Sequence, residues 1–216
     1  MNKNITIGVP HSGKIYSQFV VCFMKLAIDL VERGFIIDTQ FKEGSLIPKQ
    51  RNDIAKGAYE SGNDLLFVDS DMVFSADDFN LLYDEDKEII GGLCYSRRRP
   101  YHGVVYYDPG PEYESFARIK KQDIPFTPFE CYGVGTGFIL IKNEVLQKMY
   151  KKDFVEKYGR PFNMWNMKNG DQFGEDLSFC LRARKAGFNI WCHPQVNVGH
   201  IGNIIISKEN NNLLNS

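Results

Sequence analysis

Two aspartates stand at the end of a short apolar run in the first half of the sequence. Leu65 to Val68 is apolar throughout, and Asp69 and Asp71 follow it directly. Four consecutive apolar residues between turn-forming residues predict a strand buried on both faces, as in the centre of a helix-covered parallel sheet. Ligands bind beyond the carboxyl ends of such strands. Carboxylates at this position and spacing suit Mg²⁺ or Mn²⁺, which would in turn hold phosphate oxygens.

The tripeptide Asp84-Glu85-Asp86 has the same spacing of carboxylates. It follows no buried strand and lies in a polar connection, where charged side chains are expected to be solvated. The context, and not the spacing alone, therefore favours a functional role for Asp69 and Asp71. The alternative interpretation is that these two residues are ordinary turn carboxylates.

Length and composition restrict the class of protein. The 216 residues, 43% hydrophobic and 25% charged, have ordinary globular values and fit one domain. A formal net charge of −1 argues against nucleic acid or an anionic membrane as the main partner, because both attract basic surfaces. Cys22, Cys94 and Cys180 lie in apolar segments and are expected to be buried reduced thiols. With no signal-peptide pattern and no membrane span, a soluble cytoplasmic protein is expected.

The hydrophobic pattern predicts strands and helices in alternation up to the aspartates. Strands are expected over residues 5–9, 35–39 and 65–68, with one helix ending at Gly34 and another running from Pro48 to Gly62. This order predicts a parallel sheet with right-handed crossovers. The first helix has its apolar residues at helical spacing, namely Phe19, Phe23, Ala27 and Leu30, with Val20, Met24 and Val31 beside them.

The second half of the chain continues the same pattern with one irregular interval. A capping box of Ser75 and Asp78 predicts a helix that leaves directly from the aspartate loop. Strands are expected over 88–95, 138–141 and 190–192, helices from Asn143 and from Glu175, and a last extended piece over 196–200. Residues 101–128 indicate irregular structure or an edge hairpin. We expect a single domain over 1–203 and a tail over 204–216, either frayed or a linker cut from a longer protein.

Two glycine-rich segments resemble nucleotide-binding motifs without meeting their requirements. Residues 8–14 nearly form a P-loop, but Ile15 stands where that motif needs a hydroxyl, and Pro10 lacks an amide proton. We instead expect Pro10 and His11 beside the base or ribose of a nucleotide. The Gly-x-Gly-x-Gly segment at 133–137 precedes a strand, whereas a dinucleotide fingerprint follows one. These glycines are expected to make room at the start of the strand.

Three short motifs, taken in their order along the chain, resemble glycosyltransferases of the GT-A fold, and most closely small family-2-like enzymes, including virus- and phage-encoded ones. They are Asp69-Ser70-Asp71 at a strand end, Gly174-Glu175-Asp176 at a helix start, and Val198-Gly199-His200. The resemblance extends over residues 5–200. It implies an α/β, Rossmann-like nucleotide-diphospho-sugar transferase fold with a mostly parallel central sheet flanked by helices.

The resemblance implies a donor and metal site around the DXD motif Asp69-Ser70-Asp71. Asp71 would bind the metal, Asp69 would hold the ribose or a metal-bound water, and His200 would be the third protein ligand. Imidazole beside carboxylates suits Mn²⁺ better than Mg²⁺, which prefers all-oxygen surroundings. Arg51 and Asn52 resemble a family position near the donor nucleotide or its phosphates.

The resemblance also implies a catalytic role for the Glu175-Asp176 pair. In inverting members the aspartate, here Asp176, takes the proton from the acceptor hydroxyl, with Glu175 beside it. A sugar hydroxyl is a poor nucleophile and needs a base within hydrogen-bond reach. A helix N-terminus favours the ionised form of a carboxylate. The alternative is that Glu175 and Asp176 only cap the helix.

Two other segments could either bind a ligand or lie on the surface without a functional role. Arg97-Arg98-Arg99 follows a glycine-bearing strand and would either clamp a diphosphate or lie on the solvated surface. The aromatic loop over 158–173, which includes Trp165, would be a platform for a sugar face or an ordinary surface loop.

These observations together predict a metal-dependent, inverting hexosyltransferase. Its donor would be a nucleoside diphosphate sugar, with UDP expected as the nucleotide, and its acceptor a hydroxyl group on a glycan or another molecule. One alternative is a nucleotidyltransferase acting on a sugar phosphate. Another is a non-catalytic sugar-binding module, which would have no use for Asp176. A retaining enzyme would keep the metal site but would not need a base at Asp176.

Overall fold

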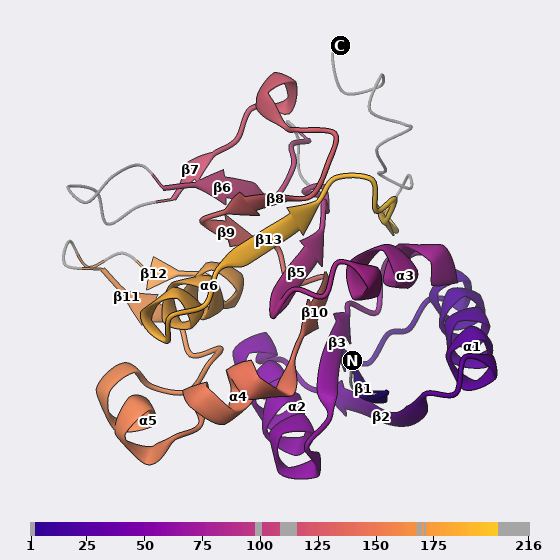
Figure 1. The fold of residues 1–216 in the computed structure, drawn as a ribbon, viewed down its shortest axis with the longest axis horizontal. Coiled ribbons are helices and arrows are strands. Elements are labelled where there is room, and N and C mark those ends of the chain that lie inside the picture. The colour runs from indigo at the N-terminus through magenta and orange to yellow at the C-terminus, as the bar shows by residue number, and fades with distance from the viewer. Residues whose placement is uncertain (1–2, 98–100, 109–115, 168–169, 171, 203–216) are drawn as a thin grey trace.

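The computed structural model describes residues 3–97, 101–108, 116–167, 170 and 172–202 (Figure 1). Its main sheet has seven strands in the order β2-β1-β3-β10-β5-β13-β8. Strands β2, β1, β3, β5 and β13 run in one direction, and β10 and β8 run against them. This confirms the predicted α/β fold with a mostly parallel central sheet. In chain order the strands are β1 (Asn4–His11), β2 (Ile36–Glu43), β3 (Asp64–Val68), β5 (Ile89–Gly92), β8 (Phe129–Cys131), β10 (Phe138–Ile141) and β13 (Ile190–His193).

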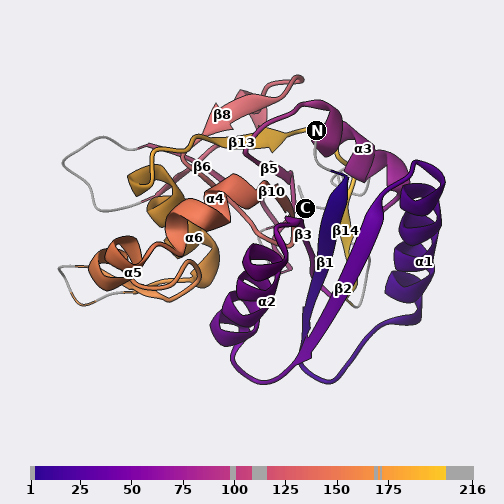
Figure 2. The same ribbon diagram turned by 60° about the horizontal axis from the view of Figure 1, so that its bottom comes forward.

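Helices cover both faces of this sheet, so the molecule has two hydrophobic cores. One core joins the sheet to α2 (Ile47–Ser61), α4 (Asn143–Met149) and α6 (Glu175–Lys185). The other joins it to α1 (Ser17–Glu32) and α3 (Ala76–Asp84). Figure 2 shows α1 and α2 on opposite sides of β1 and β2. A further short helix, α5 (Lys152–Tyr158), follows α4.

Strand β3 lies in the interior of the sheet and is buried on both faces, as predicted. Leu65 and Phe67 belong to the core under α2, whereas Leu66 and Val68 belong to the core under α1. None of the four side chains is exposed to solvent. The strand is therefore fixed from both sides immediately before Asp69, which gives the following turn a rigid base.

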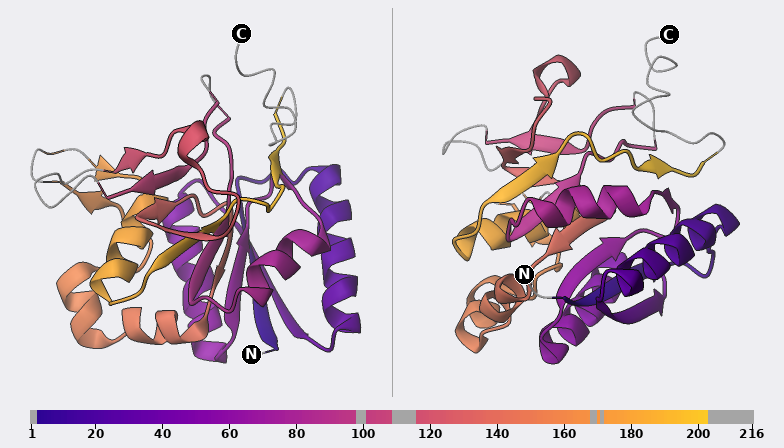
Figure 3. Two further views of the ribbon diagram at one scale, coloured as in Figure 1. Left: turned by 45° about the horizontal axis from the view of Figure 1, so that its top comes forward. Right: turned by 45° about the vertical axis from the view of Figure 1, so that its right-hand side comes forward.

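Short strands build the remaining parts of the fold. Strands β4 (Met72–Val73) and β14 (Gly199–His200) pair with each other, and β11 (Trp165–Asn166) pairs with β12 (Gln172–Phe173). A small sheet of β7 (Ala117–Arg118), β6 (Val105–Tyr107) and β9 (Gly133–Val134) lies on the opposite side of the molecule from α1 (Figure 3). The antiparallel β6–β7 pair confirms the hairpin alternative for residues 101–128, which also contain the 3-10 helix Lys121–Asp123.

Several features of the structure differ in detail from what the sequence predicted. Strand β5 ends at Gly92, earlier than expected, and the last extended piece is a paired strand only at Gly199–His200. The cysteines are free thiols; Cys94 and Cys180 are buried as predicted, while Cys22 is half-buried. The expected tail over 204–216 lies outside the described residues. None of the helices in the described ranges combines the length and apolarity that crossing a bilayer requires.

Gly8 of β1 lets helix α2 lie directly on the sheet. A Cβ atom at this position would lie 2.4 Å from Cγ2 of Ile54 and 3.2 Å from the ring of Phe67. We expect Gly8→Ala to lower the free energy of unfolding by about 1–3 kcal/mol, because both neighbours are fully packed. Urea denaturation measures this change. Gly174→Ala is the matched control, since no atom lies within 4 Å of its Cβ position, and equal stability of the two variants would contradict the prediction.

Candidate active site

Asp69, Asp71 and His200 lie together although they come from distant parts of the chain. One potential ligand atom from each side chain lies within 4.8 Å of the other two. Two carboxylate oxygens and an imidazole nitrogen form a donor set suited to a divalent ion such as Mn²⁺. The residues that the resemblance implied as metal ligands are thus close enough to share one ion.

Backbone contacts fix the three side chains in place. The Asp69 amide donates to the Gly137 carbonyl at 2.9 Å, and the Met72 amide donates to the Asp69 carbonyl at 3.0 Å, which closes the turn around Ser70. The Ile201 amide donates to the Asp71 carbonyl at 2.7 Å, next to the β4–β14 pair. The final strand therefore brings His200 to the end of β3.

Gly137 explains part of the glycine-rich segment before β10. A Cβ atom there would lie 3.2 Å from Oδ2 of Asp69, closer than most side-chain contacts. The expected room at the start of the strand is therefore occupied by the Asp69 carboxylate.

The orientation of His200 leaves one ring nitrogen available. Its Nδ1 lies 2.6 Å from the Tyr95 carbonyl oxygen. A carbonyl can only accept, so Nδ1 carries the proton and donates it to this bond. In the neutral ring Nε2 then holds the free lone pair, the arrangement commonly seen for metal-binding histidines.

Arg51 is a buried cation behind this cluster. Its side chain is only 2% exposed, and its Nη2 donates to Oδ1 of Asp69 at 2.7 Å. Its Nη1 donates to the Thr136 carbonyl at 3.3 Å, and its Nε lies 3.7 Å from a carboxylate oxygen of Glu175. Arg51 therefore joins the DXD turn to the first residue of α6, and it reaches the site through the protein interior.

Asp176 follows Glu175 in the first turn of α6 and is held by a second contact. The Thr136 hydroxyl donates a hydrogen bond to Oδ1 of Asp176. Thr136 is fully buried, so its hydroxyl and its carbonyl connect Asp176 and Arg51 within the wall of the site. Sequence reasoning did not single out Thr136; its position between two glycines, Gly135 and Gly137, was the available signal.

The electrostatic balance of the site depends on Arg51. Burial acts to lower the pKa of Arg51, but Asp69, Asp176 and Glu175 together outweigh it, so the net shift is upward. The pKa of Glu175 is raised, first by burial and then by the charge of Asp176, while Arg51 partly offsets both. Three carboxylates thus share one buried positive charge.

Arg97 is the member of the predicted Arg97-Arg98-Arg99 run that the structure describes. Its guanidinium forms an ion pair with Asp71, and its side chain is largely exposed. Asp71 is the more buried partner, at 15% exposure, so the mobile member of the pair is Arg97. Arg98 and Arg99 lie outside the described residues.

The second DXD-like tripeptide is at the surface, as predicted. Asp84 ends helix α3 and is exposed, and Asp86 forms an exposed ion pair with Lys142. The two tripeptides therefore lie in different environments, as their sequence contexts indicated.

The remaining predicted residues lie on two sides of the cluster. Pro10 and His11 end β1, the strand beside β3, and the His11 carbonyl accepts from the side chain of Gln50 at 3.3 Å. Asn52 faces the other way, where its side-chain amide donates to the Asn163 side-chain oxygen at 2.9 Å and its own oxygen accepts from the Phe162 amide at 3.0 Å.

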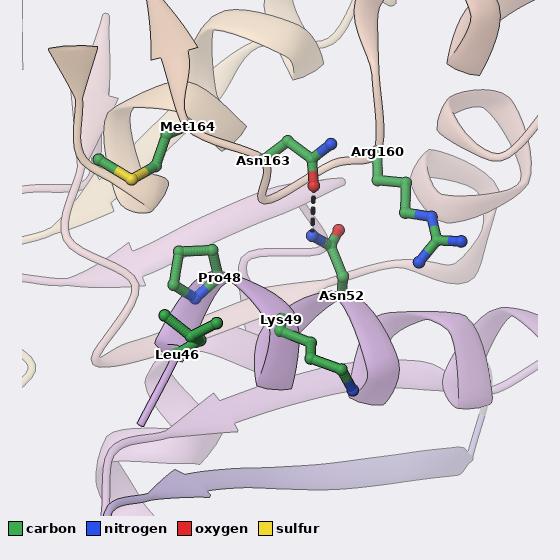
Figure 4. Close-up of a pocket in the computed structure, with 7 residues that line it drawn as sticks. All are labelled: Leu46, Pro48, Lys49, Asn52, Arg160, Asn163 and Met164. Carbon is green, nitrogen blue, oxygen red and sulfur yellow. Dashed lines mark hydrogen bonds between the residues drawn. The ribbon is translucent and has the colours of Figure 1, made fainter. Parts of the chain in front are cut away.

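A pocket of about 420 Å³ opens beside Asn52 (Figure 4). It lies between the start of α2 and the connection from α5 to β11. Trp165, the candidate platform for a sugar, lies at the edge of this connection, where the charged groups of Arg182 and Lys185 lie 5.2 and 5.6 Å from the centre of its ring. The pocket is instead lined by Leu46, Pro48, Lys49, Asn52, Arg160, Asn163 and Met164.

The fold matches several solved structures. The protein A197 from STIV is 17% identical over 97% of this chain and 91% of its own, with a TM-score of 0.58. GalNAc-T7, solved with UDP, GalNAc and Mn²⁺, is 10% identical over 92% of this chain with a TM-score of 0.54. A mutant of Drosophila β1,4-galactosyltransferase 7, solved with manganese, UDP-Gal and xylobiose, is 15% identical over 92% of this chain and 71% of its own, with a TM-score of 0.51.

This chain has the GT-A fold. The match to GalNAc-T7 spans 44% of that longer chain. No protein-family model matches the sequence, and a search of curated proteins found no similar sequence. The three-dimensional arrangement therefore confirms the GT-A fold that the three sequence motifs implied.

In the GT-A fold of this chain, the end of β3 is where the candidate site forms. The DXD turn, the last strand and the N-terminus of α6 meet there around Arg51 and Thr136. Each of the three sequence motifs therefore contributes to one compact site.

Proposed function

We propose that this chain is a metal-dependent glycosyltransferase that moves a hexose from a nucleoside diphosphate sugar, with UDP as the nucleotide, to a hydroxyl of an acceptor such as a glycan. The observation that carries the proposal is the connected set of carboxylates. Asp69 and Asp71 lie beside His200, and Arg51 and Thr136 join Asp69 to Glu175 and Asp176. The GT-A fold, and the UDP and manganese in its structural neighbours, agree with this assignment.

The DXD side of the site would hold the donor diphosphate. Asp69, Asp71 and His200 would hold a manganese or magnesium ion, which when bound acts as a Lewis acid on the leaving diphosphate. Arg97 would leave Asp71 and meet a phosphate oxygen, because an exposed guanidinium is free to rotate towards a new anion. Pro10 and His11 would lie beside the base or ribose, and Ser70 would line the donor site. Asn52, expected from the resemblance near the donor, instead directs its side chain towards Phe162 and Asn163.

The α6 side of the site would activate the acceptor. Asp176 would accept the proton of the acceptor hydroxyl as its oxygen forms a bond to the anomeric carbon of the donor. The bond from that carbon to the diphosphate breaks in the same displacement, so the product has inverted configuration and the nucleoside diphosphate leaves. Thr136 would orient the Asp176 carboxylate, and Glu175 would hold Arg51 close to it.

Loss of the base should reduce turnover and spare donor binding. We expect Asp176→Asn to lower kcat by roughly 10²–10⁴-fold, the range typical for removal of a general base. Thermal stabilisation by Mn²⁺ and the donor should be kept, because Asp176 does not belong to the metal cluster. Asp77→Asn, which changes an exposed carboxylate in the first turn of α3, is the control. Full activity of Asp176→Asn would exclude Asp176 as the base.

A panel of nucleotide sugars tests the function itself. We expect one UDP-sugar, added with Mn²⁺, to raise the melting temperature of the protein more than either component alone, by mass action on the folded state. The same mixture with an acceptor should release UDP, and the anomeric configuration of the product, read by NMR, should be inverted. Release of pyrophosphate from a nucleoside triphosphate would instead indicate a nucleotidyltransferase. Binding without turnover would indicate a sugar-binding module.

A further inference from the structure

One flank of the molecule carries most of its exposed large apolar side chains. Thirteen such side chains are exposed among the described residues, and nine of them lie between residues 15 and 41, on and around α1 and β2. Soluble monomers rarely expose contiguous apolar patches of more than a few hundred Å², and larger patches mark interaction sites. This flank lies away from the small β6–β9 sheet (Figure 3).

Helix α1 is apolar on two faces. Phe19, Leu26 and Leu30 are buried against the sheet. A second set, which we call the α1 stripe, points outward and is between 42% and 63% exposed. Four of its members are spaced by four, four and three residues, and the fifth is next to one of them, so the stripe follows one side of the helix for about three turns. The α1 stripe consists of Val20, Val21, Met24, Ile28 and Val31.

Strand β2 ends the sheet beside this helix (Figure 2). It pairs with β1 on one side over eight residues, and no strand in the described ranges pairs with its other side. Phe41 of β2 contacts Phe23 of α1 and is itself exposed, so the apolar surface continues from the helix to the strand. Ile36 is exposed on the other face of the strand. A long edge strand with exposed apolar residues is a template for pairing with another chain.

These features select a protein partner that offers a strand edge and an apolar helix together. A lipid surface has no strand edge, and the polar side of α1 mixes Lys25 with Asp29 and Glu32, which is not the basic footprint that anionic membranes attract. The chain itself offers both features. We infer that α1 and β2 form a two-fold symmetric interface between two copies of this chain.

The charges on β2 fit such a self-pairing. If two β2 strands run antiparallel with Gln40 at the two-fold axis, Asp38 lies directly opposite Lys42 of the second copy, and the reverse pair forms by symmetry. Asp38, Gln40 and Lys42 lie on the same face of the strand, because successive side chains point to opposite faces. The net charge of −1 per chain adds little repulsion between the copies.

Sedimentation velocity across the micromolar range tests the interface with the full chain. We expect wild-type protein to reach twice the mass of one chain, and Met24→Glu to weaken the dimer by roughly tenfold or more, because it places carboxylates inside an apolar contact. Phe126→Glu changes a more exposed apolar residue far along the chain from this flank and should leave the dimer intact. Circular dichroism checks that each variant folds.

A charge exchange tests the strand register. Lys42→Asp should weaken the dimer, because it places two carboxylates opposite each other, and the double variant Asp38→Lys/Lys42→Asp should recover it. Failure of this recovery in a folded double variant overturns the β2 pairing. A wild-type chain that stays monomeric, or one whose association survives Met24→Glu, overturns the interface. Binding of monomer to lipid vesicles that Met24→Glu abolishes would likewise overturn it, in favour of a membrane surface.

Discussion

We expect Asp71→Asn to remove most of the proposed sugar-transfer activity while leaving the protein folded. Asp71 offers one of the three ligand atoms of the candidate metal cluster, and a carboxamide oxygen lacks the charge that holds a divalent ion. A bound metal contributes several kcal/mol of transition-state stabilisation, so we expect kcat/KM to fall by about 10³-fold or more. Stabilisation by Mn²⁺ should disappear in the same variant, and both effects are measured with purified protein, by UDP release and by thermal unfolding.

Asp84→Asn is the matched control, since it makes the same change in the exposed tripeptide of equal spacing and should alter neither quantity. Without metal, Asp71→Asn should melt close to the wild-type temperature, because losing the ion pair with Arg97 offsets the relief of repulsion between two neighbouring carboxylates. The assignment of the metal site is excluded if Asp71→Asn keeps both its Mn²⁺ response and its activity.

Arg51→Met should produce the largest loss of stability. Arg51 is the buried cation shared by Asp69, Glu175 and Asp176, and its Nε makes no hydrogen bond within the described residues, so charge pairing dominates its role. Removal of one partner from a buried ion pair typically costs about 3–5 kcal/mol, because the remaining charge stays poorly solvated. Urea denaturation should show this loss, and activity should fall with it because the Asp69 carboxylate loses its anchor.

Two comparisons separate this role from a general effect of lost charge. Lys56→Met breaks an exposed ion pair with Glu60 on the same helix and should change stability by no more than about 0.5 kcal/mol. Arg51→Lys should recover only part of the loss, because one ammonium group cannot reach Asp69, Glu175 and the Thr136 carbonyl at once. A fully stable Arg51→Met would show that Arg51 does not organise the site.

Local patterns account for most of the fold that was predicted. The alternation of apolar runs with amphipathic segments located β1 to β3 and the two helices between them, and Gly62 ends α2 in a left-handed conformation as its position suggested. The capping box at Ser75 is present with both of its hydrogen bonds. Such signals depend on residues close in sequence, which is why they can be read without a structure.

The arrangement of the distant parts could not be read in this way. Strand β10 has the composition of a central strand but runs against β3 and β5, and its direction follows from the sheet order. Helix α1 carries two apolar faces, and the sequence does not indicate which of them meets the sheet. Arg51 was expected near the donor, whereas the structure shows it buried behind Asp69.

The sequence by itself determined the GT-A resemblance, the buried strand that ends at Asp69 and the three motifs that supply the candidate site residues, because each is encoded by neighbouring residues. Only the tertiary structure decided that His200 reaches Asp71, that Thr136 holds Asp176 and that Arg51 links the two halves of the site. These contacts join residues far apart in the chain, and they depend on which strands pair and which helix face is buried.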